Sequence, residues 1–204
     1  MGENQDLHLP DDDACTISYI YEQNGNATVE TLLNSKATCQ NIKSRMAALF
    51  SKAGEEDIVV FFFAGHGLSN GFVAYDGVLS YSVIREIYSQ CKSRNKMVFA
   101  DACYSGKLRV ASRSRIASRK QNVMFFLSSR SDEVSIEFEG MANGFFTAFL
   151  ERGLRGGADS NRNRIITARE LFDFVSTGVK EISGDMQHPV MWGNFRDDMP
   201  VIKW

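Results

Sequence analysis

The sequence predicts an α/β fold in which a largely parallel β-sheet is flanked by helices. Three apolar segments have the length of strands and lack polar alternation, as expected of strands covered on both faces: 57–64, 96–103 and 122–129. Segments with helical spacing separate them, and strands that alternate with helices favour a parallel sheet. We expect residues 1–204 to form a single domain with a substantial core.

The helices are predicted from the spacing of apolar residues and from capping residues. Thr38 precedes a segment that places Ile42, Met46, Leu49 and Phe50 on one face. A Thr-x-x-Glu capping box opens the last helix. We expect helices at 11–23, 38–53, 80–91, 143–154 and 167–179. A short strand is expected at 27–33, and the C-terminal "QHPVMWGNF" is expected to be extended.

Composition and charge exclude several classes of protein. A formal net charge of −2 gives no reason to expect nucleic-acid binding. No apolar run approaches the roughly 20 residues that span a bilayer, and the N-terminus lacks the apolar core of a signal peptide. The cysteines lie far apart, in no disulfide or zinc spacing: Cys15, Cys39, Cys91 and Cys103. We therefore expect a reduced, cytoplasmic protein in which a single cysteine carries any thiol chemistry.

Two of the predicted strands end in residues that can carry chemistry. The first ends in "FFFAGHG", with His66, and the second in "FADACYSG", with Cys103. If these strands are neighbours in a parallel sheet, both side chains emerge at the same edge. There the imidazolium lowers the thiol pKa from about 8.5 toward neutrality, and the histidine can protonate a leaving amine. Nearby glycines allow close approach of a substrate and direct backbone N–H groups to an oxyanion.

Each of these residues also has a plainer interpretation when it is taken alone. A histidine at a strand end is commonly a satisfied, partly buried group, and a free cysteine is commonly a small core residue. The occurrence of both at two strand ends, in glycine-containing motifs, favours the catalytic interpretation of His66 and Cys103.

The two motifs, in this order, resemble those of the caspase-like cysteine peptidases, and specifically the metacaspase and bacterial caspase-homologue branch. Further similarity lies in "LPDDDA", "NGFFTAFLERGLRGGAD" and "ITARELFDFVSTGV", so the resemblance covers nearly the whole chain. It implies a three-layer αβα caspase-like fold with a mostly parallel central sheet. It also implies that Cys103 is the nucleophile and His66 its acid–base partner, with the backbone N–H groups of Gly67 and Cys103 as the oxyanion hole.

The resemblance also indicates the substrate. Asp101 stands two residues before Cys103 and shares its side of the strand, so its carboxylate can pair with an arginine or lysine of a substrate. Asp13 is similar to a second acidic pocket residue, although the run of three aspartates leaves its register open. Ser128 and Ser129 are expected to line the same groove, the alternative being that they only terminate a strand.

The sequence departs from the family pattern in three places. The spacing from His66 to Cys103 is shorter than the roughly 50 residues of the caspase signature, and a compact loop, "LSNGFVAYDG", fills it. Ala64 stands where serine is common in the family. Family members begin with an apolar strand before the first helix, whereas residues 1–10 are polar. We therefore expect either a trimmed domain or a central sheet that lacks its first strand.

No metal ion or cofactor is expected. The acidic insertions by which many metacaspases bind calcium are not evident in this sequence. The segment 159–170, "DSNRNRIITARE", resembles an EF-hand loop, but Arg164 occupies the position that needs glycine. The capping box explains Thr167 and Glu170 without a metal ion.

A basic segment, "KLRVASRSRIASRKQN", follows the predicted nucleophile at 107–122 and contains no acidic residue. Its composition is typical of a flexible basic loop, 107–121. One interpretation is a solvated loop that contacts an acidic partner. The other is a site of self-processing, as the resemblance to caspase-like enzymes implies for the equivalent linker. The candidate cleavage sites are Lys107, Arg109, Arg113, Arg115, Arg119 and Lys120.

The sequence thus predicts a cysteine endopeptidase that cleaves peptides or proteins after arginine or lysine through an acyl-enzyme on Cys103. Neither nucleic acid nor a membrane is an expected partner, and the oligomeric state is left open. One alternative is an inactive caspase-like adaptor or scaffold, which the missing first strand favours. Another is a different thiol hydrolase, such as an amidase or transferase, built on the same sheet.

Overall fold

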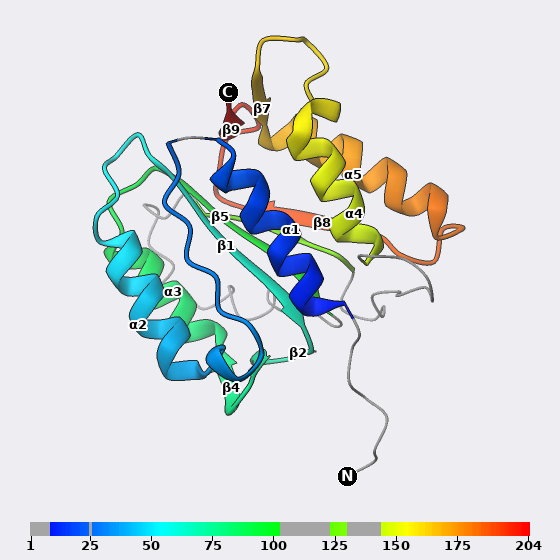
Figure 1. Ribbon diagram of the computed structural model, residues 1–204. Coiled ribbons are helices and arrows are strands. Elements are labelled where there is room, and N and C mark those ends of the chain that lie inside the picture. The colour runs from blue at the N-terminus through cyan, green and yellow to red at the C-terminus, as the bar shows by residue number, and fades with distance from the viewer. Residues whose placement is uncertain (1–8, 25, 103–122, 130–143) are drawn as a thin grey trace.

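A computed structural model describes residues 9–24, 26–102, 123–129 and 144–204 (Figure 1). Within these residues, the central sheet has the strand order β1-β5-β6-β8. Strands β1 (Ile58–Gly65), β5 (Asn95–Ala102) and β6 (Val123–Leu127) are parallel, and β8 (Val190–Gly193) is antiparallel to β6. The predicted α/β class with a mostly parallel sheet is confirmed.

Helices cover both faces of this sheet, which makes the fold three-layered (Figure 1). Helices α1 (Pro10–Glu22), α4 (Phe145–Arg152) and α5 (Ala168–Ile182) lie on one face, and α2 (Cys39–Phe50) and α3 (Tyr81–Gln90) lie on the other. A short π-helical segment, η3 (Gly153–Gly157), continues α4. All five predicted helices are confirmed, with ends that differ by a few residues from the expected ones.

Successive residues of the central strands belong to the two sides of the core. Met97 and Phe99 pack with the α1, α4 and α5 side, whereas Val98 and Ala100 pack with the α2 and α3 side. All of these side chains are buried, and each large one contributes about 1.5–3 kcal/mol to folding. Burial on both faces of the sheet explains why the sequences of these strands are continuous apolar runs.

The predicted helix caps are also present. The Thr38 side chain accepts a hydrogen bond from the N–H of Asn41 at 3.2 Å, at the start of α2. Thr167 and Glu170 form the reciprocal capping box at the start of α5. These contacts satisfy N–H groups that the first turn of a helix leaves without intrahelical partners.

The prediction of a strand at 27–33 is wrong. These residues form no strand and lead into a short 3₁₀ helix, η1 (Asn34–Lys36). A β-strand requires a hydrogen-bonded neighbour, and in the described part of the chain β1 pairs with β5 alone. Among the described residues β1 is therefore at the edge of the central sheet.

Short strands that the sequence did not reveal form two small antiparallel sheets. The compact loop expected after His66 is a meander of β2 (Gly67–Leu68), β3 (Gly71–Ala74) and β4 (Gly77–Ser80). Strand β7 (Ile165–Thr167) pairs with β9 (Pro200–Lys203). The C-terminal segment that was expected to be extended includes β8. None of the helices among the described residues combines the length and the apolar character needed to cross a membrane.

The loop that resembles an EF-hand is held by its own hydrogen bonds. Asp159 accepts from the N–H groups of Asn163 and Arg164 at 3.1 and 3.0 Å. Glu170 accepts from the side chains of Ser160 and Thr167, both at 2.8 Å. Burial opposes ionisation of Glu170, but the hydrogen bonds from Ser160 and Thr167 outweigh it and hold its pKa below the ordinary value.

The depressed pKa predicts a pH-dependent contribution of Glu170 to stability. Because the folded-state pKa is lowered, this contribution is present above the unfolded pKa of about 4.3 and is lost as pH falls through the folded value. Glu170→Ala should lower the free energy of unfolding by about 1 kcal/mol at neutral pH and by much less near about pH 3. Urea unfolding at both pH values measures this, with the exposed Glu181→Ala on the same helix as control. An equal loss at both pH values would contradict it.

Candidate active site

His66 leaves the central sheet through a turn that depends on glycine. It follows Gly65, the last residue of β1, which has a φ of +146°, a conformation that side chains disfavour. The carbonyl of His66 accepts a hydrogen bond from the N–H of Val73 at 2.9 Å, so the meander that begins with β2 holds the histidine backbone in place. The side chain of His66 is half-buried.

The same meander determines the direction of the Gly67 N–H group. In an antiparallel pair, hydrogen-bonded and non-hydrogen-bonded residue pairs alternate. His66 is hydrogen-bonded to Val73, so the next pair, Gly67 with Phe72, is the non-bonded one, and its N–H groups point away from the ladder. The Tyr81 hydroxyl donates to the Leu68 carbonyl at 2.8 Å and braces this strand. Burial raises the pKa of Tyr81 to about 12, so the hydroxyl remains a donor.

The register of β1 against β5 brings the two predicted catalytic segments to one edge of the sheet. Ala64 is paired with Asp101, and Gly65 with Ala102, the last residue of β5. His66 and Cys103 are therefore the next residues after the last pair of this ladder. The expectation that the two strands are neighbours is confirmed. Cys103 itself lies outside the described residues, so its contact with His66 stays a prediction.

Ser128 holds the end of β5 next to that position. Its Oγ accepts from the N–H of Ala102 at 3.1 Å, and its own N–H donates to the carbonyl of Ala100 at 2.9 Å. The side-chain amide of Gln187 donates to the Ser128 carbonyl at 2.9 Å, a contact that the sequence did not suggest. Ser128 and Ser129 are fully buried. Their predicted place in a substrate groove remains a prediction, whereas the tie from Ser128 to Ala102 is present.

Asp13 and Asp101 meet at the N-terminus of α4. Asp101 Oδ2 accepts from the N–H and the hydroxyl of Thr147 at 3.2 and 3.0 Å, and Asp13 Oδ1 accepts from the N–H of Gly144 at 3.2 Å. A Cβ atom on Gly144 would lie 2.7 Å from Asp101 Oδ2 and 3.7 Å from Asp13 Oδ2. Asp13 is buried, whereas Asp12 is exposed. We call Asp13 and Asp101 the acidic pair.

Two buried carboxylates so close together repel each other and require compensation. Part of this compensation comes from the N–H groups of the first turn of α4, whose partial positive charge stabilises the carboxylates. The sequence did not identify Gly144 or Thr147. The available signal was that no Ser, Thr, Asp or Asn stands at the N-cap position of α4, so its cap had to come from elsewhere in the chain.

Two further predictions concern metal ions and the basic loop. Among the residues whose positions are described, no group of three or more His, Cys, Asp or Glu side chains is arranged to hold a metal ion. The basic loop 107–121 lies outside the described residues, and with it all the candidate cleavage sites from Lys107 to Lys120.

Comparisons with known proteins identify the family. Residues 2–200 match the Peptidase C14 family, described as the caspase domain. Among solved structures, the fold is similar to the crystal structure of protein GSU0716 from Geobacter sulfurreducens, with a TM-score of 0.72 and 17% sequence identity over 97% of this chain and 88% of that one. Curated proteins give no significant match.

The chain therefore belongs to the caspase-domain family, which comprises cysteine peptidases that act on proteins. The match covers almost the whole sequence, so it includes both motifs that suggested the resemblance. Similarity to the Geobacter protein at this level of identity supports the fold alone. The metacaspase or bacterial branch within the family stays a prediction.

Proposed function

We propose that this chain is a cysteine endopeptidase that cleaves after arginine or lysine through an acyl-enzyme on Cys103. The observation that carries the proposal is the β1–β5 register, whose last pair, Gly65 with Ala102, directly precedes His66 and Cys103. Adjacent parallel strands are about 4.8 Å apart, which is within the reach of a histidine and a cysteine side chain toward each other. Membership of a family of cysteine peptidases supports the proposed roles of His66 and Cys103.

The proposed reaction has two steps. The Cys103 thiolate attacks the carbonyl carbon of the scissile bond, and the resulting oxyanion accepts hydrogen bonds from the N–H groups of Gly67 and Cys103. His66 protonates the leaving amine as the C–N bond breaks, which leaves a thioester on Cys103. In the second step a water molecule gives a proton to His66 and attacks the thioester, which releases the acid and restores the Cys103 thiolate beside protonated His66. The outward direction of the Gly67 N–H supports its role in this scheme.

The acidic pair supports the proposed preference for arginine or lysine. Asp101 immediately precedes the last residue of β5, so its carboxylate lies beside the strand end where the scissile bond would sit. Asp13 brings a second carboxylate to the same place. An aspartate side chain of a substrate would be repelled there, which separates this specificity from that of the caspases that cleave after aspartate.

Turnover of fluorogenic peptides tests the proposed activity. The wild-type chain should hydrolyse an arginine peptide and leave the matched aspartate peptide intact. Cys103→Ala should abolish hydrolysis, and His66→Ala should slow it by about 100-fold or more, since general acid–base catalysis contributes at least that factor. Cys15→Ala is the matched control, because this exposed cysteine lies in α1 and has no proposed role. Equal activity of wild type and Cys103→Ala would contradict the proposal.

A second comparison separates substrate recognition by Asp101 from its contact with α4. Asp101→Asn keeps an acceptor for Thr147 but removes the charge, so kcat/KM for arginine peptides should fall by about 100-fold. Thr147→Val removes the hydroxyl that Asp101 accepts from, so it should lower stability by about 1–2 kcal/mol and change kcat/KM far less. The exposed Asp12→Asn is the control. A similar, small effect of both variants on kcat/KM would mean that Asp101 serves only α4.

Self-processing in the basic loop follows from the same specificity, because arginine and lysine are abundant at 107–120. Wild-type protein should accumulate fragments cut after one of these residues, and Cys103→Ala should remain at full length. Intact-mass measurements on the two purified proteins, expressed side by side, test this. If both are full length, or both are cut alike, the loop is not a self-processing site.

An inactive scaffold is the second candidate function. The open edge of β1 favours it, because the strand that leads to His66 is supported by a neighbouring strand on one side only among the described residues. A folded protein with no turnover of either the arginine or the aspartate peptide would favour this alternative.

A further inference from the structure

The meander that follows His66 is apolar on both of its faces. One face packs against the core on the α2 and α3 side, through buried residues such as Phe72 and Leu79. The alternate residues form the other face, where Leu68, Val73 and Val78 are 41%, 37% and 44% exposed. The solvent-facing side of an antiparallel sheet is normally polar, so these three residues are an exception that needs an explanation. We call them the aliphatic face.

The strand pairing makes the aliphatic face one continuous surface. Val73 and Val78 are directly opposite each other in β3 and β4. Leu68 is opposite Gly71, which stands two residues before Val73 and therefore on the same side of the sheet. A Cβ atom on Gly71 would lie 2.7 Å from Val78 Cγ1, so Val78 occupies the space that a side chain at position 71 would take. The three aliphatic side chains thus adjoin one another.

The side chain of His66 leaves the meander on this same face. The N–H of Val73 donates to the carbonyl of His66 at 2.9 Å, which extends the ladder by one pair beyond Gly67 with Phe72. Residues that are directly opposite in an antiparallel pair share a face, with Cβ atoms about 4.5–5.5 Å apart. His66 also precedes Leu68 by two residues, which is the period of a strand. The imidazole and the aliphatic face are therefore neighbours.

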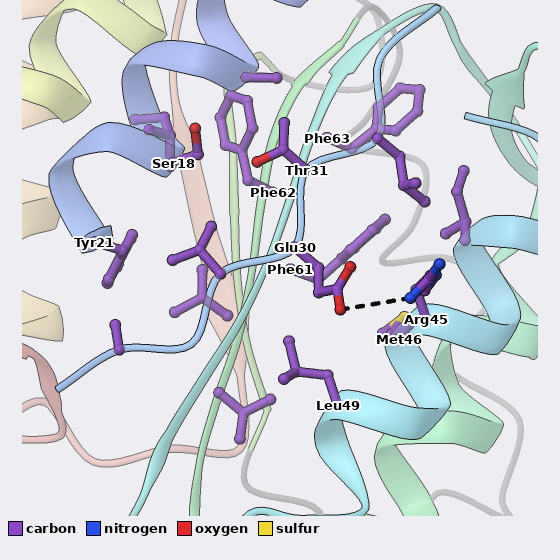
Figure 2. A pocket seen from close by; sticks show the side chains of 18 of the residues that line it. Ser18, Tyr21, Glu30, Thr31, Arg45, Met46, Leu49, Phe61, Phe62 and Phe63 are labelled. Atoms are coloured by element: carbon purple, nitrogen blue, oxygen red, sulfur yellow. Dashed lines mark ion pairs between the residues drawn. The ribbon is translucent and has the colours of Figure 1, made fainter. Parts of the chain in front are cut away.

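A cavity beside β1 agrees with this orientation of His66. Figure 2 shows part of the cavity, to which Phe61 and Phe63 of β1 and Met46 of α2 contribute side chains. Its lining also includes both His66 and Val73. The two residues therefore border one space, as expected of neighbours on the same face of the meander.

The chemistry of His66 indicates which part of a substrate meets the aliphatic face. Under the proposed function, His66 protonates the leaving amine, which belongs to the first residue after the scissile bond. For this transfer the amine nitrogen must come within about 3.2 Å of the imidazole. The side chain of the same residue begins two bonds from that nitrogen, which brings it within reach of Val73. The arginine or lysine before the bond is assigned to the acidic pair at α4, so the two sides of the scissile bond have separate sites.

We propose that Leu68, Val73 and Val78 bind the residue directly after the scissile bond and favour a branched aliphatic side chain there. This inference rests on the proposed function and adds a second specificity site to it. An aliphatic side chain gains by leaving water for this surface. A polar side chain would lose hydrogen bonds to water and find no replacement on aliphatic neighbours.

The basic loop contains bonds with this chemistry in its sequence. Three of the six candidate cleavage sites are followed by an aliphatic residue: Lys107 before Leu108, Arg109 before Val110 and Arg115 before Ile116. The other three are followed by serine, lysine or glutamine. The inference therefore favours the first three as sites of self-processing.

Two internally quenched peptides test the preference. The first, Ala-Ser-Gly-Ser-Arg-Ile-Ala-Ser, follows residues 111–118 with glycine in place of Arg113, so that it contains a single arginine. The second has threonine in place of isoleucine, and both of these residues are β-branched, so the peptide backbones have similar preferences. The wild-type chain should cleave the isoleucine peptide with a kcat/KM about tenfold higher than that of the threonine peptide.

A double variant locates the preference on the meander. Val73→Thr combined with Val78→Thr keeps the β-branched shape of both side chains and makes the surface polar. It should bring the two kcat/KM values close together, mainly by slowing the isoleucine peptide. Ile182→Thr is the matched control, because this exposed aliphatic residue ends α5 and has no proposed role. Both exposed valines lie outside the core, so the double variant should melt close to the wild type.

The outcomes separate this inference from the function on which it rests. Equal cleavage of the two peptides by the wild type, or a preference that persists in the double variant, would overturn the inference and leave the proposed function intact. A preference lost equally in Ile182→Thr would also overturn it. If the folded wild-type chain cleaves neither peptide, the proposed function fails and the inference fails with it.

Discussion

The parallel ladder between β1 and β5 is the constraint on which the rest of this structure depends. It aligns Gly65 with Ala102, the two residues that directly precede His66 and Cys103 in the sequence. Neither motif has catalytic meaning alone, because a histidine or a cysteine at a strand end is commonly structural. The apolar side chains of these two strands pack against the helices on both faces of the sheet and bury the ladder. The packing that forms the core therefore also fixes the strand ends at the candidate site.

Contacts around the two strand ends restrain the residues next to the proposed catalytic pair. Ser128 ties Ala102 to the end of β6, and the meander after β1 holds His66 through its carbonyl. The acidic pair joins β5 and α1 to the first turn of α4. In the account proposed above, Asp101 both satisfies helix N–H groups and receives the substrate cation, so a change there affects folding and recognition together.

The sequence predicted the elements whose signal is local. Continuous apolar runs indicated β1, β5 and β6, and Thr38 and Thr167 marked helix starts that the structure contains. The prediction of a strand at 27–33 was wrong, because strand formation depends on a neighbouring strand and not on composition alone. The strands of the small sheets, such as β2 and β7, are too short for a period-2 pattern to be distinguished from a loop.

The candidate site likewise contains residues that the sequence predicted and residues that it did not. Asp101 could be assigned to one side of β5 by strand geometry, but only the family resemblance suggested that Asp13, far away in the sequence, would join it. The roles of Gly144, Thr147 and Gln187 arise from tertiary contacts with no local signature, which is why they were not predicted.

The central claim is that the β1–β5 register makes His66 the partner of Cys103, and labelling by a peptidyl-arginine chloromethyl ketone tests it most directly. Mass spectrometry of the digested protein identifies which cysteine has reacted, with the exposed Cys15 as an internal reference. The account predicts label on Cys103 in the wild type and labelling about 100-fold slower in His66→Ala. Labelling of Cys15 and Cys103 at similar rates, or an unchanged rate at Cys103 in His66→Ala, would contradict it.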